Sequence, residues 1–294
     1  MFDPAFLRTL ESLSFVAKQA LRSTFKGERR SVSRGASVEF SEHRSYLPGD
    51  DLRYLDWNAY GRLDKLFLKL FREEVDLSVH LLLDVSRSMG VSSNGRPPKL
   101  EYAKRLAAAL GYVALSNLER VAIGAFNQKI QNVFPLGRGQ HRALALFQFL
   151  DTLHPDEATN LTQSVNQYLA RVKQAGVTVI ISDFFEADPG GSFQALKRLL
   201  YHQHEVCVLH VLDPEDHVPG LTGDLKLIDA ETGHAIEVSM NAALLTQYHK
   251  TFTAFCARLN DFCLRHHMTY VAVDTSIPAE DFVLQVLRLR GVLQ

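Results

Sequence analysis

The sequence predicts a doubly wound α/β fold, in which a mostly parallel sheet is covered by helices on both faces. Strand-length apolar runs recur along the chain, and they are continuous rather than alternating, as expected for strands buried on both faces. Amphipathic helical patterns lie between these runs, and this alternation is typical of doubly wound domains. The chain has 294 residues, of which 46% are hydrophobic and 22% charged, enough to bury a sizeable core.

The individual elements follow from these patterns. Five apolar runs and a sixth, antiparallel run after the turn NQK are expected to be strands, at 77–85, 121–126, 129–134, 177–182, 206–212 and 270–273. An apolar stripe with steps of three and four begins at Lys99, directly after two prolines, where proline is tolerated. Further helices are expected within 141–153, 161–174, 191–203 and 242–266, and after Pro278.

Two segments do not fit this alternation. Residues 29–74 are polar, turn-rich and aromatic, and 224–240 has the pattern of a hairpin with ETGH as its turn. We expect these pieces to pair into a small β-rich attachment, with Trp57 as its core anchor. Because 1–28 has the pattern of an amphipathic helix, the expected organisation is that helix, the attachment, and an α/β domain over 75–294.

Composition limits the class of protein. The formal net charge is −1, which does not favour nucleic acid as a partner. The three cysteines, Cys207, Cys256 and Cys263, form neither a disulfide framework nor a paired CxxC zinc pattern. The sequence shows no signal peptide and no apolar stretch long enough to span a membrane. We therefore expect a cytoplasmic protein with no membrane span.

Polar residues follow two of the predicted strands at their carboxyl ends. Asp84, Ser86 and Ser88 end the first strand in the stretch LLLDVSRSM, and Asp183 ends the strand VIIS. Thr159 lies just before a predicted helix, in a loop that should cross the same edge of the sheet. In doubly wound sheets, ligands bind at this edge. Each of these residues could instead cap a turn or a helix, but their joint placement favours a binding site.

These five side chains would supply two carboxylates and three hydroxyls. Oxygen-only ligands suit a hard cation, Mg²⁺ or else Mn²⁺ or Ca²⁺, and do not suit zinc or copper. Because hydroxyls are neutral, they would leave the ion with residual positive charge and an open position. Such an ion should attract a carboxylate from another molecule, which makes the site a recognition device rather than a catalyst.

The D-x-S-x-S pattern with a later threonine and aspartate resembles the metal-ion-dependent adhesion site of von Willebrand factor A domains. The resemblance implies that Ser86, Ser88 and Thr159 contact the ion directly, and that Asp84 and Asp183 often act through water. In that family the threonine loop usually carries glycines, whereas this chain has Glu157 and Ala158 there.

A second resemblance covers nearly the whole chain. The segment SRGASVEFSEHRSYLPGDDLRYLDW, directly before the A-like part, is similar to the R-G-x-x-x-E-F…Y-x-P-G-D-D-x-R-x-[IL]-D-W segment of the bacterial domain of unknown function 58 family. This resemblance implies an association with MoxR-type AAA+ ATPases in a chaperone-like system. The expected function is non-enzymatic: a metal-dependent adaptor that binds such an ATPase or its client through an acidic side chain of the partner.

Two rival functions remain open at this point. The same ion could activate water in a metal-assisted hydrolase, although the sequence names no clear general base. The protein could also be a scaffold whose site stays empty. No G-x-S-x-G elbow, Walker A motif or G-x-G-x-x-G loop is present in the sequence, so we expect neither a serine hydrolase nor nucleotide binding by this chain.

Overall fold

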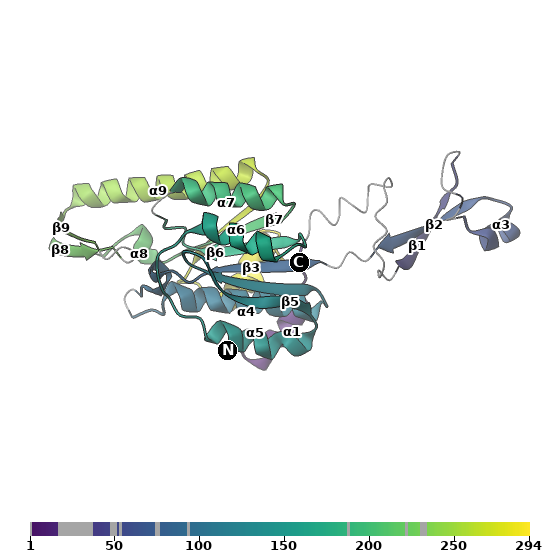
Figure 1. Ribbon diagram of the computed structural model, residues 1–294, viewed down its shortest axis with the longest axis horizontal. Helices are drawn as coiled ribbons and strands as arrows, with labels where there is room; N and C mark the ends of the chain where they lie inside the picture. Colours follow the sequence, from purple (N-terminus) through teal and green to yellow (C-terminus); the bar gives the residue numbers. More distant parts are fainter. Residues whose placement is uncertain are drawn as a thin grey trace. The chain divides into compact units, whose positions relative to one another are not determined.

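A six-stranded sheet forms the centre of the larger of two structural units in the computed structural model (Figure 1). The strand order is β10-β7-β6-β3-β4-β5; the first five strands are joined by parallel pairings, and β5 pairs antiparallel with β4. In chain order the strands are β3 (Ser78–Asp84), β4 (Arg120–Phe126), β5 (Ile130–Arg138), β6 (Val177–Ser182), β7 (Glu205–Leu212) and β10 (Thr269–Asp274). The predicted strands and the doubly wound, mostly parallel α/β fold class are confirmed.

The structure describes residues 2–16, 38–47, 52, 55–73, 77–92, 95–186, 189–220, 223–229 and 234–294. The larger unit consists of Met1–Ala17 and Leu77–Gln294, and the smaller unit of Lys18–Asp76.

Helices cover both faces of the sheet (Figure 1). One face carries α1 (Pro4–Glu11), α4 (Lys99–Ser116), α5 (Ala143–Asp151) and the C-terminal turns of α10 (Ala279–Asp281) and Phe282–Leu287. The other carries α6 (Leu161–Arg171), α7 (Pro189–Tyr201) and α9 (Ala242–Arg265). Successive residues of β3 divide between the two layers, since Leu81 and Leu83 join the first core cluster and Leu82 the second. This two-sided burial explains the continuous apolar runs.

The N-terminal helix is shorter than the sequence analysis expected. α1 ends at Glu11, where the Ser12 hydroxyl donates to the carbonyl of Thr9. The chain then becomes extended, and Phe15 forms an antiparallel bridge with Leu293. This conformation buries Leu13 and Phe15 in the main core, which a continuing helix would not do at two alternate positions. The rest of the predicted helix, 17–28, lies outside the described residues.

The expected hairpin at 224–240 is present, and the segment 29–74 also contains an antiparallel strand pair. Each pair is a two-stranded sheet in a different unit, and their predicted pairing into one attachment stays a prediction. In the smaller unit β1 (Val38–Ser45) pairs with β2 (Phe67–Glu73), and in the larger unit β8 (Gly223–Ile228) pairs with β9 (Ala235–Met240). Each strand finds its partner nearby in the sequence, where closing the intervening loop costs little entropy.

In the smaller unit, the prediction that Trp57 is a core anchor is wrong. It begins α3 (Trp57–Leu63), with Asp56 as the N-cap that accepts hydrogen bonds from the main-chain N–H groups of Asn58 and Ala59. Trp57 is 66% exposed and contacts the ring of Tyr60 edge-on, so it is not a core anchor of this segment.

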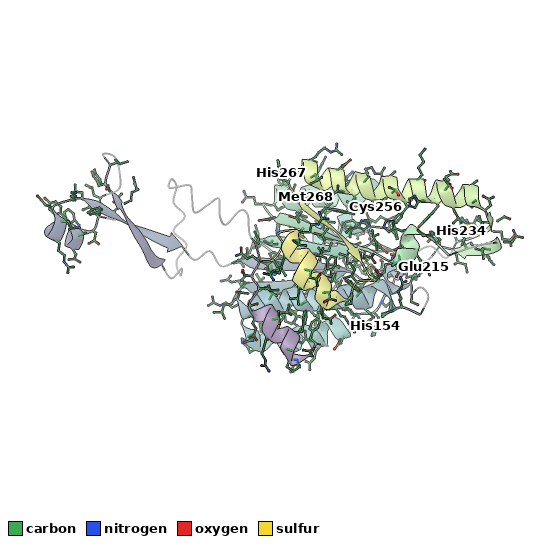
Figure 2. The ribbon with its side chains drawn as sticks, turned by 180° about the vertical axis from the view of Figure 1, so that it is seen from behind. His154, Glu215, His234, Cys256, His267 and Met268 are labelled. Carbon is green, nitrogen blue, oxygen red and sulfur yellow. The ribbon has the colours of Figure 1, made fainter. Side chains whose placement is uncertain are left out.

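The carboxyl end of the sheet carries a projecting part of the larger unit. There α8 (Pro214–His217) follows β7 and leads into the β8–β9 hairpin, after which α9 runs back along the sheet (Figure 1). Figure 2 shows Glu215 of α8 and His234 beside β9 at one end of this unit, and His267 and Met268, after α9, toward the other. The buried residues of α9 lie in its second part, Phe252 to Cys263.

Among the described residues, no helix is both long enough and apolar enough to cross a membrane.

Candidate metal centre

Asp84 is the centre of a cluster of oxygen atoms at the carboxyl end of β3. It is fully buried, and its Oδ1 accepts a hydrogen bond of 2.9 Å from the main-chain N–H of Ser86. Its Oδ2 accepts one of 2.5 Å from the hydroxyl of Ser182, the last residue of the neighbouring strand β6. Because β3 and β6 are parallel neighbours, their carboxyl ends bring these side chains together.

The two serines of the motif follow directly after β3. Ser86 precedes a single 3-10 turn, Arg87–Gly90, and this turn directs Ser88 back toward Ser86. Their hydroxyl oxygens lie 3.0 Å apart, and both residues are buried, whereas Arg87 between them is exposed. The alternate spacing of the serines therefore places two hydroxyls on the inner side of the loop and one cationic residue on the outer side.

Asp183 joins this cluster from the end of β6. Its Oδ1 accepts a hydrogen bond of 3.2 Å from the hydroxyl of Ser88, and the side chain is fully buried. The main-chain oxygen of Asp183 lies 3.0 Å from Nε2 of His210, whose Nδ1 lies 2.9 Å from the hydroxyl of Tyr270. Burial lowers the pKa of His210 to about 4 despite the neighbouring Asp183. A neutral His210 thus braces the main chain that carries Asp183.

Thr159 reaches the cluster from the loop before α6. Its hydroxyl lies 3.3 Å from both carboxylate oxygens of Asp84. The fully buried Asn127 holds this loop through two hydrogen bonds. Its side-chain Nδ2 donates to the carbonyl of Asp156, and its main-chain carbonyl accepts from the main-chain N–H of Asn160. Glu157 takes a left-handed conformation with φ of 54°, at a place where the A-domain resemblance leads one to expect glycine.

Two of the site loops approach closely at Gly90. A Cβ atom added there would lie 2.7 Å from Cβ and Cγ of Pro155, closer than such atoms approach in real structures. Glycine at the end of the 3-10 turn therefore allows the serine loop to pack against the loop that carries Thr159. The main-chain N–H of Arg87 also donates to the carbonyl of Glu157 between the same two loops.

The electrostatics of the cluster are those of two carboxylates buried together. Burial and, next, the negative charge of Asp183 raise the pKa of Asp84 to about 7, against the hydrogen bonds from Ser182 and Ser86. The fold by itself therefore stabilises the ionised form of Asp84 poorly. A divalent cation among these oxygens would favour the ionised form, as bound cations do for their ligands.

Lys99 supplies a cation beside the cluster. It is only 4% exposed, and its Nζ lies 2.7 Å from Oδ2 of Asp183 and 3.4 Å from Oδ2 of Asp216 on α8. The ammonium also lies over the ring of Phe185, 4.7 Å from its centroid. Burial alone would lower the pKa of Lys99, but the two carboxylates raise it above its ordinary value. Asp183 thus presents one oxygen to Lys99 and the other to Ser88.

The structure brings together all five residues that the sequence analysis proposed as metal ligands: Asp84, Ser86, Ser88, Thr159 and Asp183. The hydrogen-bonding contacts between their oxygens span 3.0 to 3.3 Å. Adjacent ligands of an octahedral Mg²⁺ ion, each about 2.1 Å from the metal, are separated by about 3 Å. The donor set therefore fits a hard cation in both chemistry and spacing. Their role as ligands stays a prediction.

In the described part of the chain, no group of three or more His, Cys, Asp or Glu side chains could hold a metal ion. The candidate centre at Asp84 differs from such a group, because three of its five proposed ligands are hydroxyl side chains.

Sequence reasoning missed four residues that shape this centre: Ser182, Lys99, Asp216 and Asn127. Ser182 could have been found, since it directly precedes Asp183 at the end of an apolar run. The sequence predicted Lys99 only as the start of a helix. Nothing in the sequence predicts that this helix begins close to α8.

The sequence family described as "Protein of unknown function DUF58" matches residues 42–256, more than half of the chain. This chain belongs to the DUF58 family. Uncharacterized proteins of Mycobacterium bovis and Mycobacterium tuberculosis are each 27% identical to it over 255 residues, which cover 86% of this chain and 79% of the relative.

Similar solved structures have low identity to this DUF58 protein. The conserved hypothetical protein BatB from Bacteroides thetaiotaomicron is 20% identical, with a TM-score of 0.44, covering 73% of this chain and 98% of BatB. A manganese-loaded TRAP protein from Plasmodium vivax is 12% identical, with a TM-score of 0.39, covering 74% of each chain.

Proposed function

We propose that this DUF58 protein is a non-enzymatic adaptor that binds a partner protein through a divalent cation at the Asp84 centre. The observation that carries the proposal is the convergence of five oxygen-bearing side chains from three loops, with contacts of 3.0 to 3.3 Å among them. Mg²⁺ is the proposed ion, with Mn²⁺ or Ca²⁺ as substitutes.

The chemistry of the donors favours binding over catalysis. Three of the five donors are neutral hydroxyls, and one of the two carboxylates is shared with Lys99, so the donors would compensate the charge of a bound ion only in part. A carboxylate of a partner protein is the ligand that this arrangement would attract.

A hydrolase would need a general base within reach of a metal-bound water. His210 is the histidine that contacts Asp183, but it is fully buried and both of its ring nitrogens have hydrogen-bonding partners. This observation argues against His210 as the base of a metal-assisted hydrolase.

The partner we propose is a MoxR-type AAA+ ATPase, or the client that it remodels, in a chaperone-like system of the cytoplasm. The support for this partner is membership of the DUF58 family together with the resemblance of the segment before the A-like part.

The test is the affinity of this chain for the MoxR-type ATPase, measured by biolayer interferometry at constant Mg²⁺ concentration. Comparing the wild type with Asp84→Asn at constant Mg²⁺ leaves the ATPase's own nucleotide site unaffected. The matched control is Asp151→Asn, at the exposed end of α5. We expect Asp84→Asn to weaken binding at least tenfold and Asp151→Asn to have no effect. Equal affinity of all three proteins would contradict the proposal.

A further inference from the structure

Lys99 occupies a position that helix formation does not favour. It is the first residue of α4, and a cation at a helix N-terminus opposes the helix dipole. It is also almost completely buried, where an ammonium group is costly unless paired. Its carboxylate partners, Asp183 and Asp216, come from two different loops at the carboxyl edge of the sheet. The position of Lys99 is therefore explained by these partners rather than by its helix.

Of its two partners, Asp183 belongs to the candidate metal centre. Oδ2 of Asp183 contacts Lys99 at 2.7 Å, while Oδ1 contacts the hydroxyl of Ser88 at 3.2 Å. The ammonium thus lies on the opposite side of this carboxylate from the other proposed ligands. A cation bound beside Oδ1 would share the carboxylate with Lys99 and would be repelled by its charge, in a buried region where such repulsion is poorly screened.

Asp216 belongs to α8 and competes for the same ammonium at 3.4 Å. Its Oδ2 also accepts a hydrogen bond of 2.8 Å from the main-chain N–H of Asp213, and its carbonyl accepts one of 2.8 Å from the hydroxyl of Tyr248 on α9. Asp216 is therefore fixed in place, and its negative charge partly offsets the effect of the Lys99 ammonium on Asp183.

We propose that Lys99 is an internal counter-ion that weakens the hold of the Asp84 centre on a divalent cation, so that the isolated chain binds the cation weakly and a carboxylate from outside the chain strengthens binding. In this role Lys99 acts electrostatically on Asp183, and the negative charge of Asp216 determines how strong that effect is. This inference rests on the proposed function, because it concerns the same centre. It identifies Lys99 as the residue that makes the affinity for the cation depend on the partner.

The test is Mg²⁺ binding by the isolated chain, measured by calorimetry without any partner. Lys99→Met removes the charge and keeps most of the side-chain volume. The matched control is Lys104→Met, because Lys104 is also 4% exposed on α4 but pairs with Glu101. We expect Lys99→Met to bind Mg²⁺ at least tenfold more tightly than the wild type, and Lys104→Met to match the wild type.

A second variant shifts the affinity in the opposite direction and covers the case in which Lys99→Met does not fold. Asp216→Asn removes the competing charge, so Lys99 should act on Asp183 alone and Mg²⁺ affinity should fall at least threefold. Unchanged affinity in the folded variants, with a wild type that binds Mg²⁺, would overturn the role of Lys99 and leave the proposed function intact. Absence of Mg²⁺ binding in the wild type and in every variant would overturn both.

Discussion

The hydroxyl of Ser182 donates a hydrogen bond of 2.5 Å to Oδ2 of Asp84, which joins the carboxyl ends of the neighbouring strands β6 and β3. The same hydroxyl accepts a hydrogen bond of 2.9 Å from the main-chain N–H of Phe184. Ser182 therefore fixes both the central carboxylate and the turn that follows Asp183. Phe184 adopts a left-handed conformation there, with φ of 56°, which an aromatic residue seldom does.

Ser182→Ala should lower the free energy of unfolding by about 1–3 kcal/mol, because a buried carboxylate oxygen and a main-chain N–H would each lose a partner. Urea unfolding followed by circular dichroism measures this change. The same variant should weaken Mg²⁺ binding, because Asp84 would no longer be held in place. A variant as stable as the wild type would show that this hydrogen bond does not organise the centre.

Gly90→Ala should also destabilise the protein, by about 1–3 kcal/mol, because its methyl group would overlap the ring of Pro155. Relief of this overlap would push the serine loop away from the loop of Thr159, so Mg²⁺ affinity should fall as well. The control is Gly220→Ala, whose added methyl group meets nothing within 4 Å. Thermal unfolding of both variants, with and without Mg²⁺, checks the prediction. Equal behaviour of the two alanine variants would refute it.

Leu10→Ala tests whether α1 is part of the larger unit. Leu10 is fully buried and belongs to the same core cluster as the helices α4 and α5. Truncating such a leucine costs about 2–5 kcal/mol, through lost burial and the cavity left behind. The half-buried Leu7 provides the control, and Leu7→Ala should cost clearly less. Urea unfolding that shows similar small effects for both variants would contradict the packing of α1 described above.

Acid should destabilise the larger unit partly through the buried pair His80 and His204. Burial lowers the pKa of His80 to about 3 and that of His204 to about 4, and their rings lie 5.1 Å apart. Both are neutral in the folded state, whereas in the unfolded chain they gain protons below about pH 6.5. The unfolded state then binds more protons, so stability falls as pH falls from about 6.5 toward 4.

The two groups together should remove about 2 kcal/mol of stability between pH 6.5 and 5.5. His204→Gln should reduce the pH-dependent loss by about 1 kcal/mol, because one of the two groups no longer titrates. The exposed His141 serves as the control, since His141→Gln should leave the slope unchanged. Urea unfolding at the two pH values gives the comparison. An identical slope in wild type and His204→Gln would rule out this source of acid sensitivity.

The fold was predictable because its strands are buried on both faces. An apolar run such as VTVIIS needs no partner information to be recognised as a central strand, and parallel strands place their polar ends at one edge. For this reason Asp84, Asp183 and the two serines could be assigned to one place before the structure was known.

Other features could not be predicted, because they depend on contacts between segments distant in the sequence. Lys99 and Asp216 are 117 residues apart, and their pairing follows from the way α8 leaves β7 beside the start of α4. The exposure of Trp57 likewise depends on packing that hydrophobic patterns do not specify.

The most direct test of a metal centre at Asp84 is Mg²⁺ binding to the isolated wild-type chain and to Asp84→Asn, measured by calorimetry at neutral pH. Asn has the size of Asp but lacks the charge that holds a cation. We expect saturable binding of about one ion per chain in the wild type, in line with one octahedral oxygen site, and loss of that binding in a folded Asp84→Asn protein. Equal Mg²⁺ binding by the two proteins, or none by either, would contradict it.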